Sequence, residues 1–255
     1  DFGMAPNSFI PLNFKSQEIP VKAIAAFFQK DPAVLISHKS SNFDKIEDLK
    51  LSKVMISPDT RIGFWRFLKV RFQFDDSQIA PYTFNLAPFL ANKDAVQQGY
   101  ITSEPYLIKR SGIEPKVFLL ADSGYSSYAG IIQTRSELIN EKPELIQRFI
   151  NASILGWYSF LYDDPNPAFK MILKNNPDMT VNLLENAHKL IKSRELVDSE
   201  DAKVSGIGTM THKKWKRFFK TMVLDNLYEK NLNYKDAYTL EFINKGVGLN
   251  YVSEN

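Results

Sequence analysis

The chain has 255 residues, of which 44% are hydrophobic and 24% charged, a balance typical of a globular protein with a sizeable core. Its 32 Lys and Arg residues exceed its 29 Asp and Glu residues by only three, which argues against nucleic acid as the main partner. The absence of cysteine excludes disulfides, thiolate metal sites and a cysteine nucleophile. No stretch approaches the roughly 20 apolar residues of a membrane span.

The first residue is Asp1, and neither an initiating methionine nor a signal peptide precedes the folded sequence. We therefore expect the chain to derive from a longer precursor, by processing or by truncation.

The first half of the chain alternates short apolar runs with amphipathic segments. The apolar runs predict strands at residues 21–28, 33–37, 53–57, 79–84, 100–102, 117–120 and 128–134. The segments between them predict helices at residues 43–49, 63–72, 88–97 and 106–110. Strands that alternate with helices are typical of βαβ units, so we expect an α/β fold with largely parallel sheets.

The second half is mainly helical. Amphipathic patterns predict helices at residues 144–161, 167–173, 181–191, 213–224 and 234–242. The densest basic run, residues 212–217, is interpreted as the solvated face of one of these helices.

Signatures of catalysis are weak. The three histidines are too scattered for a metal cluster, and no HExxH pattern, GxSxG elbow or phosphate loop is present. The glycine-rich residues 205–209 do not follow a predicted strand, so they are interpreted as a loop. The sequence therefore predicts no catalytic residue, no metal site and no cofactor.

Polar or aromatic groups stand at four expected strand ends, the first of them just after residues 1–5, and ligands of open α/β sheets bind at such ends. At the first end, Asn7 or Ser8 either caps the next helix or leaves free N–H groups for a polar or anionic ligand atom. At the second, beside Thr60, Arg61 is either a surface side chain near Asp59 or the partner of a ligand carboxylate, phosphate or sulfonate.

The other two strand ends carry carboxylates. Glu104 can accept hydrogen bonds from ring N–H or amino groups of a ligand, and its alternative role is a structural salt bridge. Asp122 precedes a flexible glycine and Tyr125, which form either a ligand site or a simple turn. Aromatic residues make up 13% of the chain. Phe64 and Tyr125 are expected near the strand ends, together with Phe9, Trp65 and Tyr82. Aromatic faces with a few polar groups suit a planar heteroaromatic ligand.

Five segments, in this order and spacing, resemble one known family. They are the Asp1-Phe2-Gly3 start with residues 20–25, residues 43–50 with the strand at 53–57, residues 98–105, residues 128–135 with 143–149, and residues 244–249. The family is that of the NMT1/THI5-like, or SsuA-like, solute-binding proteins of bacterial ABC importers. The similarity runs over nearly the whole chain, and the order of the segments carries it.

The resemblance implies a type II periplasmic-binding-protein-like fold of two α/β lobes joined by a hinge. Residues 1–42 and 124–255 would form lobe I and residues 43–123 lobe II, with the N-terminal part of lobe I missing. The ligand would lie in the cleft between the lobes, facing Asn7, Arg61, Glu104 and Tyr125. The protein would be a monomer, periplasmic or lipid-anchored outside the cell membrane, and its partner would be an ABC permease in the inner membrane.

The resemblance also bears on the ligand. Residues 59–63 stand where sulfonate binders of this group have a Gly-Ser-like turn, and the Glu104 carboxylate repels a sulfonate but suits an aminopyrimidine. We therefore expect a small heteroaromatic ligand related to thiamine precursors. Three alternatives stay open: a binder of a sulfonate-like or nitrate-like anion, a pyrimidine-precursor synthase of the THI5-like type, and the ligand-sensing domain of a regulator.

Overall fold

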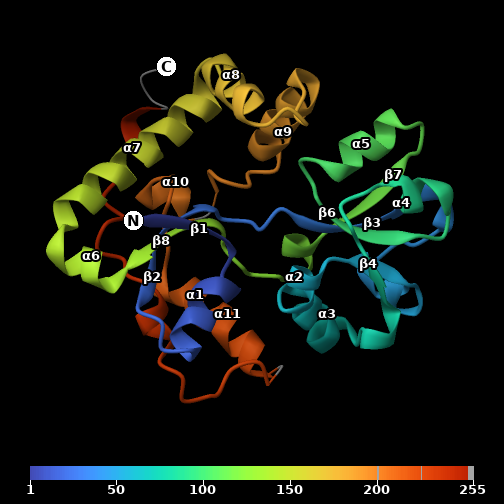
Figure 1. The fold of residues 1–255 in the computed structure, drawn as a ribbon, viewed down its shortest axis with the longest axis horizontal. Helices are drawn as coiled ribbons and strands as arrows, with labels where there is room; N and C mark the ends of the chain where they lie inside the picture. The colour runs from blue at the N-terminus through green and yellow to red at the C-terminus, as the bar shows by residue number, and fades with distance from the viewer. Residues whose placement is uncertain (200, 225, 252–255) are drawn as a thin grey trace. The chain divides into compact units, whose positions relative to one another are not determined.

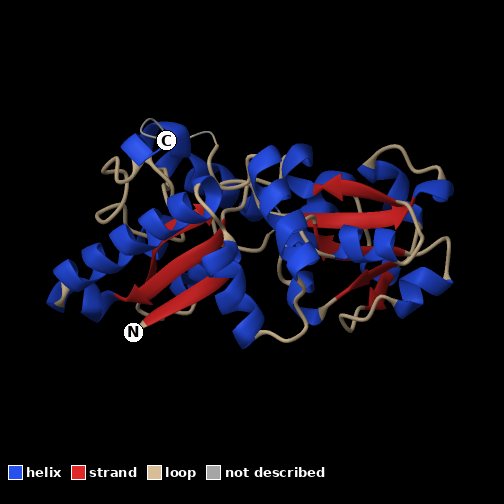
Figure 2. Ribbon diagram, turned by 90° about the horizontal axis from the view of Figure 1, so that it is seen from above, coloured by secondary structure: helices blue, strands red, loops and turns tan. Residues whose placement is uncertain are grey.

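The structure, a computed structural model, describes residues 1–199, 201–224 and 226–251 (Figure 1). The chain divides into two compact units. Unit 1 consists of Asp1–Asp31, Ser126–Phe219 and Glu229–Asn255, and unit 2 consists of Pro32–Tyr125 and Lys220–Tyr228. Each unit contains one sheet, as Figure 2 shows.

The chain crosses between the two units at other residues than the lobe boundaries expected after residues 42 and 123. The chain leaves unit 1 after Asp31, because the next strand pairs only with strands of unit 2. It returns after Tyr125, and a third segment, Lys220–Tyr228, also joins unit 2.

The sheet of unit 1 has three strands in the order β1-β8-β2. They are β1 (Phe2–Asn7), β2 (Val21–Phe28) and β8 (Ala129–Arg135). The central strand β8 is antiparallel to both neighbours, so β1 and β2 run in the same direction. Their carboxyl ends therefore lie at one edge, together with the amino end of β8.

The helices of unit 1 cover both faces of this sheet. They are α1 (Phe9–Ser16), α6 (Ser136–Glu141), α7 (Pro143–Tyr162), α8 (Asn166–Asn175), α9 (Val181–Ser193), α10 (Ala202–Ser205) and α11 (His212–Leu224), the last of which ends in unit 2. Helix α7 packs on one face, where Trp157 lies 5.6 Å from Phe27 of β2 between ring centroids. Helices α1 and α11 lie on the other side (Figure 1) and meet through Phe9 and Phe218, whose ring centroids are 4.9 Å apart.

The predicted helix at 234–242 is wrong, since only a 3₁₀ turn forms there, at Tyr234–Ala237.

The sheet of unit 2 has five strands in the order β5-β4-β6-β3-β7. They are β3 (Ala33–His38), β4 (Val54–Ile56), β5 (Ile79–Pro81), β6 (Val96–Tyr100) and β7 (Pro115–Leu119). Strands β5, β4 and β6 are parallel, whereas β3 is antiparallel to β6 and to β7.

The expectation of largely parallel sheets is therefore wrong. In each sheet one strand runs antiparallel to both of its neighbours, β8 in unit 1 and β3 in unit 2, and the same feature of the chain path explains both. Strands β3 and β8 are the first strands after the chain passes from one unit to the other. A parallel neighbour requires a crossover connection, usually a helix, and these two strands enter their sheets without one. Each is inserted between two strands that a helix does connect: β8 between β1 and β2, and β3 between β6 and β7.

The helices of unit 2 are short: α2 (Pro58–Arg61), α3 (Phe64–Phe72), α4 (Ala87–Ala91) and α5 (Glu104–Arg110). The predicted helix at 88–97 and strand at 100–102 are wrong, because α4 stops at a turn where Asn92 Oδ1 accepts from the Asp94 N–H at 3.0 Å. Residues 96–100 then pair with β3. The predicted helix at 43–49 is a 3₁₀ helix at Ile46–Leu51.

Within the described residues, none of the helices combines the length and the apolar character needed to cross a membrane.

Tyr238 leads to a prediction about the stability of unit 1 at high pH. It is 3% exposed, stacks on Trp215 with 4.8 Å between ring centroids and hydrogen-bonds His212 Nδ1 at 2.6 Å. Burial raises the pKa of Tyr238 to about 12. The unfolded state therefore loses this proton near pH 10 while the folded state keeps it, so the free energy of unfolding should fall between about pH 10 and 12. Urea unfolding at pH 9 and pH 11 measures the fall, and Tyr238→Phe should make it smaller. An equal fall in both proteins would contradict this assignment.

Candidate functional site

The carboxyl ends of the three parallel strands of unit 2 lie at one edge of the sheet, and polar side chains gather there. Strand β4 is followed by Ser57, β5 by Tyr82, and β6 ends at Tyr100. The Tyr82 N–H donates to the Ile56 carbonyl at 3.2 Å, which fixes the end of β5 against the end of β4. This edge is where an open α/β sheet binds its ligand.

Glu104, the first residue of α5, is held at this edge by two donors. Its Oε2 accepts from the Tyr100 N–H at 2.8 Å, and its Oε1 accepts from the Tyr82 hydroxyl at 3.4 Å. Gly99 makes room for it, since a Cβ there would lie 3.0 Å from Glu104 Oε2. Burial and the Glu104 charge both raise the pKa of the Tyr82 hydroxyl, so it stays protonated and donates. Each carboxylate oxygen has a second lone pair, so Glu104 can still accept from a ligand.

Two exposed aromatic residues adjoin the two donors that hold this carboxylate: Phe84 packs on Tyr82, and Tyr100 itself supplies the backbone N–H. Phe84 is 72% exposed and lies 5.2 Å from Tyr82 between ring centroids, and Tyr100 is 49% exposed. Phe84 has φ 60, a left-handed conformation that is uncommon for a side chain of this size. An apolar ring held in solvent in this way offers a face on which a planar ligand can stack.

Thr60 belongs to the same edge. Its Oγ1 lies 3.1 Å from Ser57 Oγ, and the Ser57 N–H donates to Gln98 Oε1 at 2.7 Å. Ser57, Thr60 and Gln98 thus form a hydrogen-bonded group across the ends of β4 and β6.

Arg61 lines a different pocket, of about 360 Å³, between α3 and the edge strand β5. Arg66 and Lys69 line it as well, with Asp76 as a carboxylate. Asp76 accepts from Trp65 Nε1 at 2.8 Å and from Lys69 Nζ, and both bonds lower the pKa of Asp76. This pocket has an excess of positive charge and does not include Glu104.

The remaining predicted residues of unit 2 fall into two further places. Asp122 is exposed and lines a third pocket with Asp44 and Arg71, which shares no residue with the pocket of Arg61. Tyr125 is 3% exposed, and its ring packs against Phe64 at 6.5 Å and Phe67 at 5.2 Å. The structure therefore brings Phe64 and Tyr125 together, as buried rings.

In unit 1, Asn7 is the last residue of β1, which extends beyond the expected end at residue 5, and Ser8 follows the strand. Asn7 Oδ1 accepts from the Phe9 N–H at 3.1 Å, in a turn at the start of α1. Ser8 is fully buried and does not cap α1 with its side chain: its Oγ accepts from the Tyr128 N–H at 2.9 Å, and its own N–H donates to Ser127 Oγ at 3.1 Å. These bonds tie the end of β1 to the start of β8.

The interpretation of residues 212–217 as a solvated helix face is wrong for Trp215, which is fully buried, and for Lys214, which is 6% exposed. Its Nζ donates to the Gln29 carbonyl and lies 4.5 Å from the centroid of the Tyr128 ring. The sequence did contain a signal for this burial, since Lys214 stands four residues before the apolar Phe218 and therefore lies on the same helix face.

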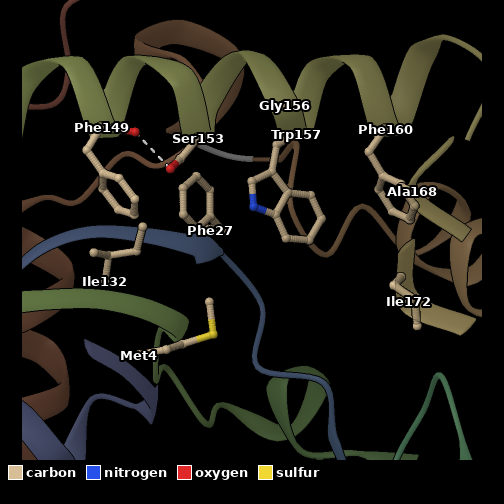
Figure 3. Close-up of a pocket in the computed structure, with 10 residues that line it drawn as sticks. All are labelled: Met4, Phe27, Ile132, Phe149, Ser153, Gly156, Trp157, Phe160, Ala168 and Ile172. Atoms are coloured by element: carbon tan, nitrogen blue, oxygen red, sulfur yellow. Dashed lines mark hydrogen bonds between the residues drawn. The ribbon is translucent and has the colours of Figure 1, made fainter. Parts of the chain in front are cut away.

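An apolar groove of about 450 Å³ in unit 1 contains none of the predicted site residues (Figure 3). It lies between α7, α8 and the sheet, and Figure 3 shows Phe27, Phe149 and Trp157 lining it. Phe149 is 38% exposed, and Met4 at the rim is 70% exposed. Among the described residues that line it, Ser153 carries the one hydroxyl, which donates to the Phe149 carbonyl at 2.8 Å.

The three histidines are each engaged separately. His38 Nε2 bonds the Phe89 carbonyl at 2.9 Å, His188 Nε2 bonds the Phe160 carbonyl at 2.8 Å, and His212 bonds Tyr238. The described part of the chain holds no group of three or more His, Asp or Glu side chains placed to bind a metal ion.

Comparison with solved structures identifies the fold. The periplasmic aliphatic sulphonate-binding protein SsuA from Escherichia coli superposes with a TM-score of 0.65 at 12% identity, over 93% of this chain and 74% of that one. The desulfurization enzyme DszB superposes with a TM-score of 0.58 at 10% identity, over 94% of this chain and 83% of that one. The chain therefore has the periplasmic-binding-protein fold, as expected.

The family follows from the sequence. The model of the NMT1/THI5-like family matches residues 1–168, and the chain belongs to this family. A curated relative, the riboflavin-binding protein RibY of Chloroflexus aurantiacus, is 23% identical over 238 residues, which are 91% of this chain and 67% of the relative.

Proposed function

We propose that this chain is the extracytoplasmic solute-binding component of an ABC importer, and that it acts by binding rather than by catalysis. Membership of the NMT1/THI5-like family, the periplasmic-binding-protein fold and a curated relative named as a riboflavin-binding protein support this proposal. Its partner would be the importer's permease in the membrane, and the binding protein would work as a periplasmic or lipid-anchored monomer.

The solute we propose is a small planar heteroaromatic molecule with ring N–H or amino groups, such as a pyrimidine precursor of thiamine or a flavin. The observation that carries this proposal is Glu104, a carboxylate held by Tyr82 and Tyr100 at the carboxyl edge of the parallel strands. A fixed carboxylate accepts hydrogen bonds from ring donors and repels a sulfonate. Phe84, which packs on Tyr82, and Tyr100 are exposed aromatic residues of the same edge and can offer stacking faces.

The other predicted contacts remain predictions. Thr60 lies at the same edge as Glu104, whereas Arg61, Asp122 and the buried Ser8 have other surroundings. Ligand contacts by Asn7, Phe64 and Tyr125, and a ligand held between the two units, also remain predictions.

A second candidate solute is a small anion such as a sulfonate. The pocket of Arg61, Arg66 and Lys69 favours it, because three cations face one carboxylate there. Guanidinium groups bind sulfonate and phosphate oxygens well.

A thermal-shift panel tests the proposal. The chain is melted alone and with riboflavin, 4-amino-5-hydroxymethyl-2-methylpyrimidine, taurine or nitrate, each at the same concentration. A ligand that binds only the folded state raises the melting temperature by mass action. At a ligand concentration of 100 times its Kd, the free energy of unfolding rises by about 3 kcal/mol. We expect a rise with a heteroaromatic compound and none with taurine or nitrate. A rise with taurine or nitrate alone would support the anion instead and contradict our proposal.

A further inference from the structure

The cationic pocket of unit 2 has no role when Glu104 alone holds the solute. This name is given to the pocket of about 360 Å³ lined by Arg61, Arg66 and Lys69. Pockets for small molecules typically have about 300–1,000 Å³, so this one is large enough to hold part of a solute. Arg61 is exposed, and its guanidinium group has no hydrogen-bond or ion-pair partner among the residues that the structure describes.

The carboxylate that lines this pocket does not neutralise Arg61. Asp76 accepts from Trp65 Nε1 at 2.8 Å, and its two oxygens lie 3.2 and 3.1 Å from Lys69 Nζ, so its charge is matched by Lys69. An ammonium group has three donors, and those that Asp76 does not take can still donate to a ligand. A held ammonium group in the same pocket as an unpaired guanidinium group suits the oxygens of an anion.

Two segments of unit 2 join the cationic pocket to the edge that carries Glu104. In α2, Thr60 belongs to that edge, and the next residue, Arg61, lines the pocket. In β5, the first residue, Ile79, lines the pocket, and Tyr82, three residues further on, donates to Glu104. Three residues of a strand span about 10 Å at most. A single small molecule of that length can therefore reach both places.

We propose that the solute is the phosphate monoester of a planar heteroaromatic compound, with Glu104 accepting from the ring while Arg61 and Lys69 bind the phosphate. This inference rests on the proposed function and narrows the class of solute. A phosphate monoester carries a charge of about −1.5 to −2 at pH 7, which suits a pocket lined by three cations and one carboxylate. A sulfonate such as taurine has a single negative charge and no ring, so it would fill only the pocket.

The test uses two pairs of compounds, each a parent and its phosphate monoester, titrated by calorimetry into the wild-type chain. They are riboflavin with riboflavin 5′-phosphate, and 4-amino-5-hydroxymethyl-2-methylpyrimidine with its phosphate. For at least one pair, we expect the phosphate to bind at least about tenfold more tightly than the parent, as hydrogen bonds between charged groups provide.

Two variants locate the phosphate. Arg61→Gln should reduce the preference for the phosphate over its parent to less than about threefold, because the unpaired guanidinium group is lost. The matched control, Arg110→Gln, removes an exposed cation of α5 in the same unit. It should leave the preference within about twofold of the wild-type value, since exposed charges outside the pocket contribute little.

The outcomes separate this inference from the proposed function. If none of the four compounds binds the wild type, the proposed function fails, and the inference fails with it. If a parent compound binds and neither phosphate binds more tightly than its parent, the proposed function stands and the phosphate site is wrong. If Arg61→Gln and Arg110→Gln lower the preference equally, the overall charge of the chain causes it, which also overturns the inference. The comparison of parent and phosphate needs no variant, so it decides the matter even if Arg61→Gln does not fold.

Discussion

Replacement of Gly248 by alanine is expected to destabilise the chain by about 2–5 kcal/mol. Two costs add at this position. Gly248 has φ +76, a left-handed conformation that disfavours a side chain, and a Cβ there would lie 2.4 Å from Cδ2 of Tyr158. Tyr158 cannot move away easily, since it is 1% exposed and its hydroxyl accepts from the Ile207 N–H at 3.3 Å. The midpoint of urea unfolding measures the loss.

Two other glycines separate these costs. Gly112 has φ +86 but no atom within 4 Å of the Cβ site, so Gly112→Ala should cost only the backbone term, about 1–2 kcal/mol. Gly156 lies inside α7 with open space around it, so Gly156→Ala should be neutral or stabilising by up to about 1 kcal/mol. Equal stability of Gly248→Ala and Gly112→Ala would show that the contact with Tyr158 is not made.

Replacement of Glu104 by glutamine should weaken the binding of a heteroaromatic solute about 10-fold to 100-fold, because a hydrogen bond to a charged group contributes about 1.5–3 kcal/mol. Glutamine keeps the shape of the side chain and can still accept from the Tyr100 N–H, so the fold should survive. Titration calorimetry with the best compound of the thermal-shift panel measures the change in Kd.

The control for this variant is Glu114→Gln, which removes an exposed carboxylate of the same unit that lies 3.5 Å from Lys109. It should leave the Kd unchanged, since exposed ion pairs contribute little. If Glu104→Gln binds the heteroaromatic compound as well as the wild type does, Glu104 does not contact the solute. If it instead gains affinity for taurine, the anionic candidate is favoured.

The strands could largely be predicted from the sequence, because runs such as residues 21–28 and 33–37 are apolar over the length of a buried strand. The error at residues 88–100 has a local cause. Gln97 and Gln98 look polar, as in an exposed helix, but they lie in a central strand, where Gln98 accepts from the Ser57 N–H. The strand directions could not be predicted, since they depend on where the chain passes between the units.

The site was only partly predictable. Glu104 was found because it lies shortly after a predicted strand, and its carboxylate accepts from the N–H of Tyr100, the last residue of β6. The burial of Lys214 was missed, because a charged residue in a basic run gives no sign of burial unless its helix face is considered. Trp65 and Phe9 were expected near the strand ends but are each 1% exposed, in the core, because helical side chains next to a strand end point back onto the sheet as easily as toward the edge.

The most direct test of the account is a fluorescence titration of riboflavin with the purified chain, in competition with taurine. If the chain is a heteroaromatic solute-binding protein, flavin fluorescence should change to saturation at one riboflavin per chain, and excess taurine should not reverse the change. If riboflavin and the aminopyrimidine both fail to bind while taurine binds the chain tightly, the proposed solute class is wrong.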